Sequence, residues 1–151
     1  MGQGKQENSL DPAYARFAQS PTKLSWYAHE PWKDCASCHD VQRQAESPSQ
    51  TYFLAPVPEL CYNCHTDHRD ATSSVHGPVA VGDCLFCHDP HKSRIEHLLK
   101  QPVPKLCYLC HDMNDIGSIP AHPIEEASKC TDCHDAHASF ARTLLKEASS
   151  Q

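Results

Sequence analysis

The sequence is poor in the residues that build a hydrophobic core. Leucine, isoleucine, valine and phenylalanine together make up 25 of 151 residues, about 17%, below the roughly 20% that a packed globular chain needs. So few apolar side chains cannot offset the conformational entropy that is lost on folding. With 12 prolines and only 5 glycines, long helices and large sheets are not expected either. We therefore expect a mostly irregular fold with short α-helices and little or no strand, and an interior that something other than polypeptide fills.

Other missing features exclude whole classes of protein. No run of 18 apolar residues is present, so no transmembrane segment is expected. The beginning of the chain, Met1-Gly-Gln-Gly-Lys-Gln-Glu, lacks the apolar stretch of a secretory leader. The formal net charge is −6 and the 13 lysines and arginines form no cluster, so nucleic acid is not an expected partner.

Cysteine and histidine, in contrast, are abundant, at 10 and 12 residues. All ten cysteines lie in five Cys-x-x-Cys pairs, and a histidine follows each pair. We number these motifs I to V: residues 35–39, 61–65, 84–88, 107–111 and 130–134. Cys-x-x-Cys-His is the attachment motif of c-type haem. Two thiols three residues apart can add to the vinyl groups on one edge of a porphyrin, and the adjacent histidine then ligates the iron from one face.

The sequence therefore predicts five haem c groups, each with one iron, wrapped by the chain into a haem stack. The predicted haem-attaching residues are Cys35, Cys38, Cys61, Cys64, Cys84, Cys87, Cys107, Cys110, Cys130 and Cys133. The predicted proximal iron ligands are His39, His65, His88, His111 and His134.

Two other uses of paired cysteines compete with this interpretation. Structural zinc sites use Cys-x-x-Cys units in pairs, but five is an odd number and zinc does not require a histidine after every unit. A disulfide scaffold would also use ten cysteines, but a bridge across two residues closes a very small loop and constrains little.

The chain repeats itself with a period of 46 residues. Pro-Val-Pro-Glu-Leu-Cys at residues 56–61 matches Pro-Val-Pro-Lys-Leu-Cys at 102–107, and Leu-Leu-Lys recurs at 98–100 and 144–146. We expect an N-terminal arm, 1–24, with a helical turn near 12–18, and one pentahaem domain, 25–151, of two and a half repeats: 25–68, 69–116 and 117–151. Short helices are expected around each motif and at 93–100 and 139–148.

Each haem iron has a second axial position, which a protein side chain can fill. Met1 and Met113 are the only thioethers, so methionine could serve two haems at most. Regularly placed histidines outside the motifs are better candidates: three precede motifs I, III and V by six to eight residues, and three follow a motif histidine by three. The distal candidates are His29, His68, His76, His91, His122 and His137.

Six distal candidates for five irons predict complete bis-histidine ligation with one spare. A histidine three residues after a motif histidine cannot reach the far face of its own haem, so it should ligate a neighbouring one. The first repeat has Gln42 in the place of His91 and His137, so His68 could substitute there. We expect His137 to be the spare, because its repeat has no second motif, and His97 to be an ordinary surface histidine.

The motifs resemble the doubled-CXXCH family of multihaem c-type cytochromes over residues 26–146. The segment that carries the resemblance runs His76-Gly-Pro-Val-Ala-Val-Gly-Asp-Cys84-Leu-Phe-Cys87-His88-Asp-Pro-His91, followed by a leucine pair and motif IV. The chain is also similar to small pentahaem periplasmic electron donors and to half of the decahaem outer-membrane conduits. The resemblance implies low-potential bis-histidine haems, a periplasmic or extracellular location, and electron relay without substrate turnover.

Electron transfer, with no catalytic residues, is the expected function, because filled axial positions leave no iron open to a substrate. The expected partners are redox proteins with basic docking surfaces, such as quinol-linked cytochromes, terminal reductases or outer-membrane cytochromes, since haem propionates make the protein more acidic. One alternative is self-assembly, as a subunit of an extracellular cytochrome filament or of an outer-membrane conduit. Another is a multihaem reductase, which needs a five-coordinate haem. Haem c attachment implies export, with the leader already removed.

Overall fold

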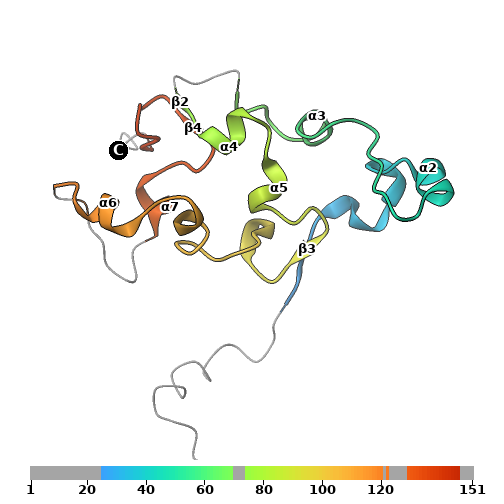
Figure 1. Ribbon diagram of the computed structural model, residues 1–151, viewed down its shortest axis with the longest axis horizontal. Helices are drawn as coiled ribbons and strands as arrows, with labels where there is room; N and C mark the ends of the chain where they lie inside the picture. The colour runs from blue at the N-terminus through green and yellow to red at the C-terminus, as the bar shows by residue number, and fades with distance from the viewer. Residues whose placement is uncertain (1–24, 70–73, 121, 123–128, 147–151) are drawn as a thin grey trace, which may run out of the picture.

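The computed structural model is an open arrangement of short helical turns joined by irregular segments (Figure 1). It describes residues 25–69, 74–120, 122 and 129–146. The N-terminal arm expected at 1–24, with its helical turn near 12–18, lies outside the described residues. The expected fold class is confirmed: the chain is mostly irregular, with short helices and two very small sheets.

The helical segments are three to six residues long and each strand has two residues. None of the helices in the described part of the chain has the length and apolar character needed to cross a membrane. In chain order the elements, with η for a 3-10 turn, are β1 Tyr27–Ala28, η1 Glu30–Lys33, η2 Cys35–Ser37, α2 Val41–Glu46, α3 Glu59–Tyr62, β2 Ser74–Val75, α4 Gly77–Ala80, α5 Cys84–Cys87, β3 Lys92–Ser93, η3 Glu96–Leu98, η4 Cys107–Leu109, α6 Met113–Gly117, α7 Cys130–Cys133 and β4 Ala138–Ser139.

Each of the five motifs folds as one helical turn, as the sequence predicts. The elements are η2, α3, α5, η4 and α7. In all five, the backbone N–H of the motif histidine donates to the carbonyl of the first cysteine, at 2.9–3.1 Å. This bond between residues four apart is the α-helical one, and it brings the two cysteines, three residues apart, to one side of the turn.

The two small sheets join successive repeats. Strand β1 pairs antiparallel with β3, and β2 pairs antiparallel with β4. Both ladders continue by one bond between histidines: the N–H of His29 donates to the carbonyl of His91 at 2.9 Å, and that of His76 to His137 at 2.8 Å. The segment ahead of one motif is therefore held against the segment that follows the first motif of the next repeat.

The helix expected over residues 93–100 is reduced to the three-residue 3-10 turn η3, Glu96–Leu98, so the prediction was wrong about its extent. The segment begins in β3, passes through His97 and Leu98 with φ of 58° and 57°, and returns to the motif, where Leu99 forms a backbone bridge with His88. The copy in the third repeat does the same: Leu144 has a φ of 57° and Leu145 bridges to His134. The helix expected at 139–148 is thus also wrong as far as residue 146, where the described residues end.

A serine side chain explains this turn. Ser93 Oγ donates to the carbonyl of Leu99 at 2.6 Å and accepts from the N–H of Ile95 at 2.9 Å. Ser139 repeats the pattern with Leu145 and Ala141, at 2.5 and 3.1 Å. A serine bonded to the backbone two residues further on offers that backbone an alternative to the helix, so a tight return loop forms instead.

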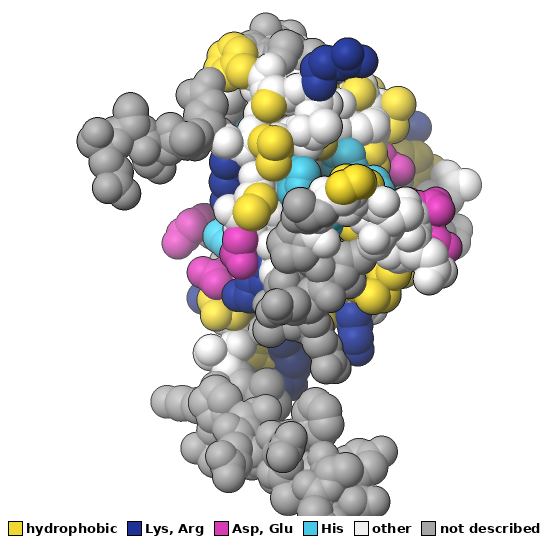
Figure 2. All heavy atoms as spheres, turned by 90° about the vertical axis from the view of Figure 1, so that its left-hand side faces the viewer, with side chains coloured by type: hydrophobic (Ala, Val, Ile, Leu, Met, Phe, Trp, Pro, Cys, Tyr) yellow, Lys and Arg dark blue, Asp and Glu magenta, His cyan; other side chains and the backbone are white. Residues whose placement is uncertain are grey.

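The polypeptide forms no hydrophobic core among the described residues. Apart from Pro58, no aliphatic or aromatic residue is buried there, whereas the polar residues Ser93 and Ser139 are only 8% and 7% exposed. Large apolar side chains such as Val81, Leu109 and Phe140 remain 59–79% exposed. On the face shown in Figure 2, histidine side chains gather near the middle among hydrophobic ones, and charged side chains lie towards the edge. The shortage of apolar residues in the sequence thus has its counterpart in the structure.

One close backbone contact joins the segments that lead into motifs II and III. Gly82 has a φ of +78° and lies against the buried ring of Pro58. A Cβ on Gly82 would lie 2.4 Å from Cδ of Pro58, closer than real atoms approach. Glycine is therefore required here both by conformation and by space.

We predict that Gly82→Ala destabilises the folded protein. The left-handed conformation alone costs an L-residue about 1–2 kcal/mol, and the contact with Pro58 adds to this. The matched control is Gly77→Ala, because a Cβ at Gly77 meets nothing within 4 Å. Thermal unfolding of the haem-loaded proteins should show a lower Tm for Gly82→Ala and an unchanged or slightly raised Tm for Gly77→Ala; equal Tm values would contradict the required glycine.

Candidate haem-binding sites

The structure brings each motif histidine opposite one histidine from outside the motifs. The ring planes within each pair lie within 28° of parallel, and the ring centroids are 5.8–6.2 Å apart. The five pairs are His39–His91 at 6.0 Å, His65–His29 at 5.8 Å, His88–His137 at 5.9 Å, His111–His76 at 6.0 Å and His134–His122 at 6.2 Å.

This spacing fits one iron between two imidazoles. A metal–imidazole bond is about 2.0 Å long and a ring nitrogen lies roughly 1.1 Å from its ring centre, so two ligands on opposite faces of one metal have centroids about 6 Å apart. Aromatic rings in direct contact span a wider range, about 4.5–7 Å. The narrow range and the one-to-one pairing, repeated at all five motifs, are what a set of axial ligand pairs requires.

His68 is the distal candidate without a motif histidine opposite it in the described residues. Its ring instead stacks on that of His137, with centroids 4.7 Å apart and planes at 10°. His137 in turn faces the motif histidine His88. The geometry thus favours His68 as the spare, whereas the sequence led us to expect His137. The first repeat needs no substitute for Gln42, because His91 of the next repeat faces His39.

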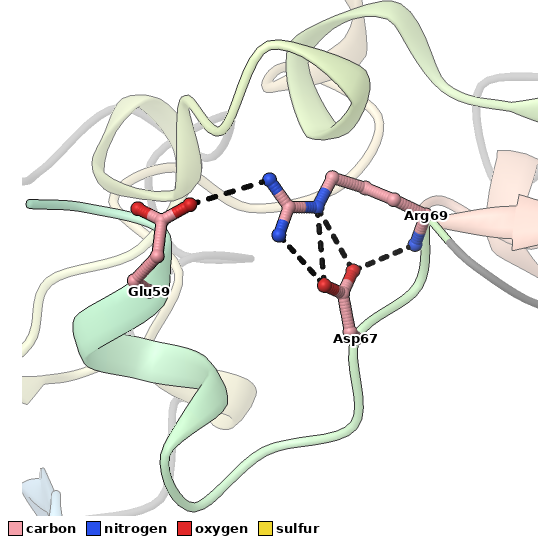
Figure 3. Close-up of polar contacts among 3 residues, drawn as sticks. All are labelled: Glu59, Asp67 and Arg69. Atoms are coloured by element: carbon pink, nitrogen blue, oxygen red, sulfur yellow. Dashed lines mark hydrogen bonds and ion pairs between the residues drawn. The ribbon is translucent and has the colours of Figure 1, made fainter.

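An ion-pair cluster holds the segment that carries His68 (Figure 3). The guanidinium of Arg69 donates to both carboxylate oxygens of Asp67 at 2.7–3.2 Å, and the backbone N–H of Arg69 donates to Oδ1 at 2.9 Å. These hydrogen bonds hold the pKa of Asp67 below its ordinary value. Nη1 of Arg69 also lies 3.6 Å from Oε1 of Glu59, and its guanidinium lies over the ring of Tyr62 at 4.9 Å. The loop that ends with His68 is thereby tied to helix α3.

Backbone carbonyls accept hydrogen bonds from the second ring nitrogen of several of these histidines. Nδ1 of His29 lies 3.1 Å from the carbonyl of Pro90, and Nδ1 of His76 lies 3.0 Å from that of Ala136. A metal-bound histidine ordinarily uses its other nitrogen in this way, which fixes the ring orientation and raises the basicity of the ligand. The arrangement leaves Nε2 of each ring to bind a metal.

Two motif histidines have the same kind of partner. Nδ1 of His88 lies 2.8 Å from the carbonyl of His97, and Nδ1 of His134 lies 2.8 Å from that of Thr143. His97 was expected to be an ordinary surface histidine, but its backbone carbonyl thus helps to orient the ring of His88. No sequence signal could have identified this role, because a backbone carbonyl leaves no trace in residue type.

Two aspartates position the histidines that follow motifs III and V. Asp89 Oδ1 accepts from the N–H of His91 at 2.9 Å and lies 4.0 Å from its Nδ1. Asp135 Oδ1 accepts from the N–H of His137 at 2.8 Å and lies 3.9 Å from its Nδ1. The hydrogen bond from His91 is the main cause of the lowered pKa of Asp89. Sequence reasoning missed both aspartates, although the repeated order His-Asp-x-His would have pointed to them.

The haem-attaching cysteines of consecutive motifs lie next to one another. Burial, followed by the neighbouring Cys84 thiol, raises the pKa of Cys61 to about 11. In the next repeat, burial and the Cys130 thiol raise the pKa of Cys107 to about 11 in the same way.

Weaker thiol–thiol interactions complete the series. The Cys38 thiol of motif I also raises the pKa of Cys61 of motif II, and the Cys110 thiol of motif IV raises the pKa of Cys87 of motif III. The five motifs therefore follow one another in space in the order in which they occur along the chain, which the ribbon also shows (Figure 1).

The donor set fits haem iron and does not fit zinc. Within the described ranges, no three histidine, cysteine, aspartate or glutamate side chains converge on one point that could hold a metal ion. A structural zinc takes four protein ligands, whereas a haem iron takes only its axial ligands from the protein. None of the ten cysteines is in a disulfide bond.

Paired histidines at haem-attachment motifs, on a chain without a core of its own, define a multihaem c-type cytochrome, a class of electron-transfer protein. A model of the family described as "Doubled CXXCH motif" matches residues 29–70, 76–115 and 122–151, about three quarters of the sequence. The chain belongs to this family. No curated protein matches it.

We predict that Ser93→Ala destabilises the loop that closes on motif III. The change leaves the Leu99 carbonyl and the Ile95 N–H without their partner in a buried position, which typically costs about 1–3 kcal/mol. Ser118→Ala is the control, because its hydroxyl donates to the carbonyl of Asp115 at an exposed site. Thermal unfolding should show a lower Tm for Ser93→Ala only. A drop of the same size in both variants would contradict the role of the buried loop.

Proposed function

We propose that the protein relays electrons through five covalently bound bis-histidine c-type haems. The observation that carries this proposal is the one-to-one pairing of five motif histidines with five others at 5.8–6.2 Å. We name the haems I to V after their motifs. Each would be held by the two cysteines and the histidine of its motif, with His91, His29, His137, His76 and His122 as the respective distal ligands.

The order of the haems supports a relay. Cysteines of motifs I and II, II and III, III and IV, and IV and V interact with each other, so haems attached to them would be neighbours in that order. Electrons would pass along one file in chain order, from haem I to haem V or the reverse. A single pentahaem domain, residues 25–151, contains the whole file.

Filled axial positions make this protein a carrier and not an enzyme. With histidine on both faces, no iron has a free position for a substrate in the resting state. Histidine in place of methionine as the second ligand also keeps the reduction potential low, because methionine raises it. Hydrogen bonds at Nδ1 and the burial of each haem would spread the five potentials.

Charge points to the kind of partner. The chain carries −6, and five oxidised haems with ionised propionates bring the total to about −11. We infer docking by redox proteins with basic surfaces, in the periplasm or outside the cell. The surface around Trp26 is an exception to the acidic character, because two basic side chains, Lys92 and Arg94, lie over its ring at 5.1 and 4.5 Å. A basic partner would therefore dock away from this cluster.

A haem count with a spectrum of the iron tests the proposed function. The pyridine haemochrome of the exported, purified protein should give five haems c per chain. Low-temperature EPR of the oxidised protein should show low-spin iron without a high-spin signal, because every iron has two histidine ligands. A count of three or four, or a high-spin signal from a stoichiometric haem, would contradict the proposal.

The choice between His137 and His68 as ligand can be tested by replacing each. We expect His137→Ala to convert one haem of five to the high-spin form, because it removes the residue that faces His88. We expect His68→Ala to leave all five low-spin, because His68 stacks only behind His137. EPR of both variants at equal haem content is the measurement, and the reverse result would make His68 the ligand.

A further inference from the structure

His122 differs from the other four histidines that face a motif histidine. Its pair, with His134, has the longest centroid separation, 6.2 Å, and the largest interplanar angle, 28°, against 15–17° in the other four. Its Nδ1 is buried and has no hydrogen-bond partner, and it is the one buried side-chain nitrogen or oxygen in the described part of the chain with that property. In the other four histidines an oxygen lies near Nδ1. For His29 and His76 it is a backbone carbonyl oxygen at 3.0–3.1 Å, and for His91 and His137 it is an aspartate carboxylate oxygen at 3.9–4.0 Å.

The difference follows from how the repeats pair. His29 and His76 each precede a motif by six to eight residues and belong to a segment that is hydrogen-bonded to the next repeat. That repeat supplies their Nδ1 acceptors, the carbonyls of Pro90 and Ala136. His122 occupies the same place in the third repeat, yet it faces His134 of the motif that directly follows it, 12 residues further on. His29 and His76 instead face the second motif of their repeats. The four other pairs join residues 35–52 positions apart.

A ligand without a second hydrogen bond binds its metal more weakly. The hydrogen bond at the far nitrogen makes a histidine more basic and holds its ring in place, and loss of such a partner typically costs 10–100-fold in metal affinity. A buried, unpartnered Nδ1 is also unfavourable in itself, and it gains water or a new partner when the ring swings away. Both effects favour release of His122 relative to His29 and His76, whose Nδ1 atoms have carbonyl partners. The second effect also distinguishes His122 from His91 and His137, whose Nδ1 atoms lie near a carboxylate and are not left buried without a partner.

We propose that haem V is a binding site for a small neutral π-acceptor ligand of the carbon monoxide or nitric oxide class, which replaces His122 on the ferrous iron. In this exchange the bond between iron and Nε2 of His122 breaks and one bond between iron and the incoming ligand forms. No electron is transferred, and the released imidazole stays neutral. The inference rests on the proposed five-haem function and adds to it one haem that exchanges its ligand while the other four only carry electrons.

Carbon monoxide is the probe, used with the full-length, haem-loaded protein after reduction with dithionite. Optical titration of wild-type protein should give one bound carbon monoxide per five haems. The variant His122→Ala should still bind one, with a higher affinity than the wild-type protein because no histidine competes for the iron. The matched control His29→Ala opens haem II in addition, so it should bind two.

The outcomes separate this inference from the proposed function. A wild-type protein that contains five haems and binds no carbon monoxide would overturn the inference and leave the five-haem relay intact. Two bound molecules in His122→Ala would also overturn it, because the wild-type site would then lie on another haem. Wild-type stoichiometry needs no variant, so the proposal remains testable if His122→Ala fails to fold, and the haemochrome count is made on the same sample.

Discussion

The proposed haem stack depends on axial coordination between histidines that lie far apart in the chain. Apart from Pro58, no aliphatic or aromatic residue in the described part of the chain is buried, so the polypeptide has no hydrophobic core from which folding could draw stability. Four of the five facing pairs join residues 35–52 positions apart, and an iron between them would act as a cross-link. Because a metal that binds only the folded arrangement adds its binding energy to folding, the haems would serve at once as interior, cross-link and redox centre.

Very little secondary structure is needed to arrange these pairs. Two-residue strands place His29 beside His91, and His76 beside His137, through one backbone hydrogen bond in each case. The two members of each such couple face different motifs, so one ladder serves two neighbouring haem sites. His122 instead faces His134, in the motif that directly follows it. The fifth facing pair therefore joins residues 12 positions apart, in contrast to the long separations of the first four pairs.

Much of the site was predictable because its chemistry is local. Each Cys-x-x-Cys-His motif carries its own geometry within one helical turn, and the regular spacing of the other histidines marked them as candidates. The helix expected at residues 93–100 failed because Ser93 and Ser139 bind their own backbone, and the short-range pattern of leucines did not reveal that competition. The sequence could not indicate the spare histidine for a different reason: which ring reaches which motif depends on contacts between repeats, and residue spacing within one repeat does not contain them.

Composition and motifs alone indicated the class of cofactor, the repeat and the absence of a conventional core. These properties depend on residue type and on distances of a few positions, which the chain carries wherever it lies in space. Tertiary structure decided that His137 faces His88, that His68 stacks behind it, that backbone carbonyls of Pro90 and Ala136 hold distal rings, and that His122 has no such partner. Such contacts arise only when separate repeats meet, because a hydrogen bond or a shared metal between distant residues is set by their final positions and not by their order.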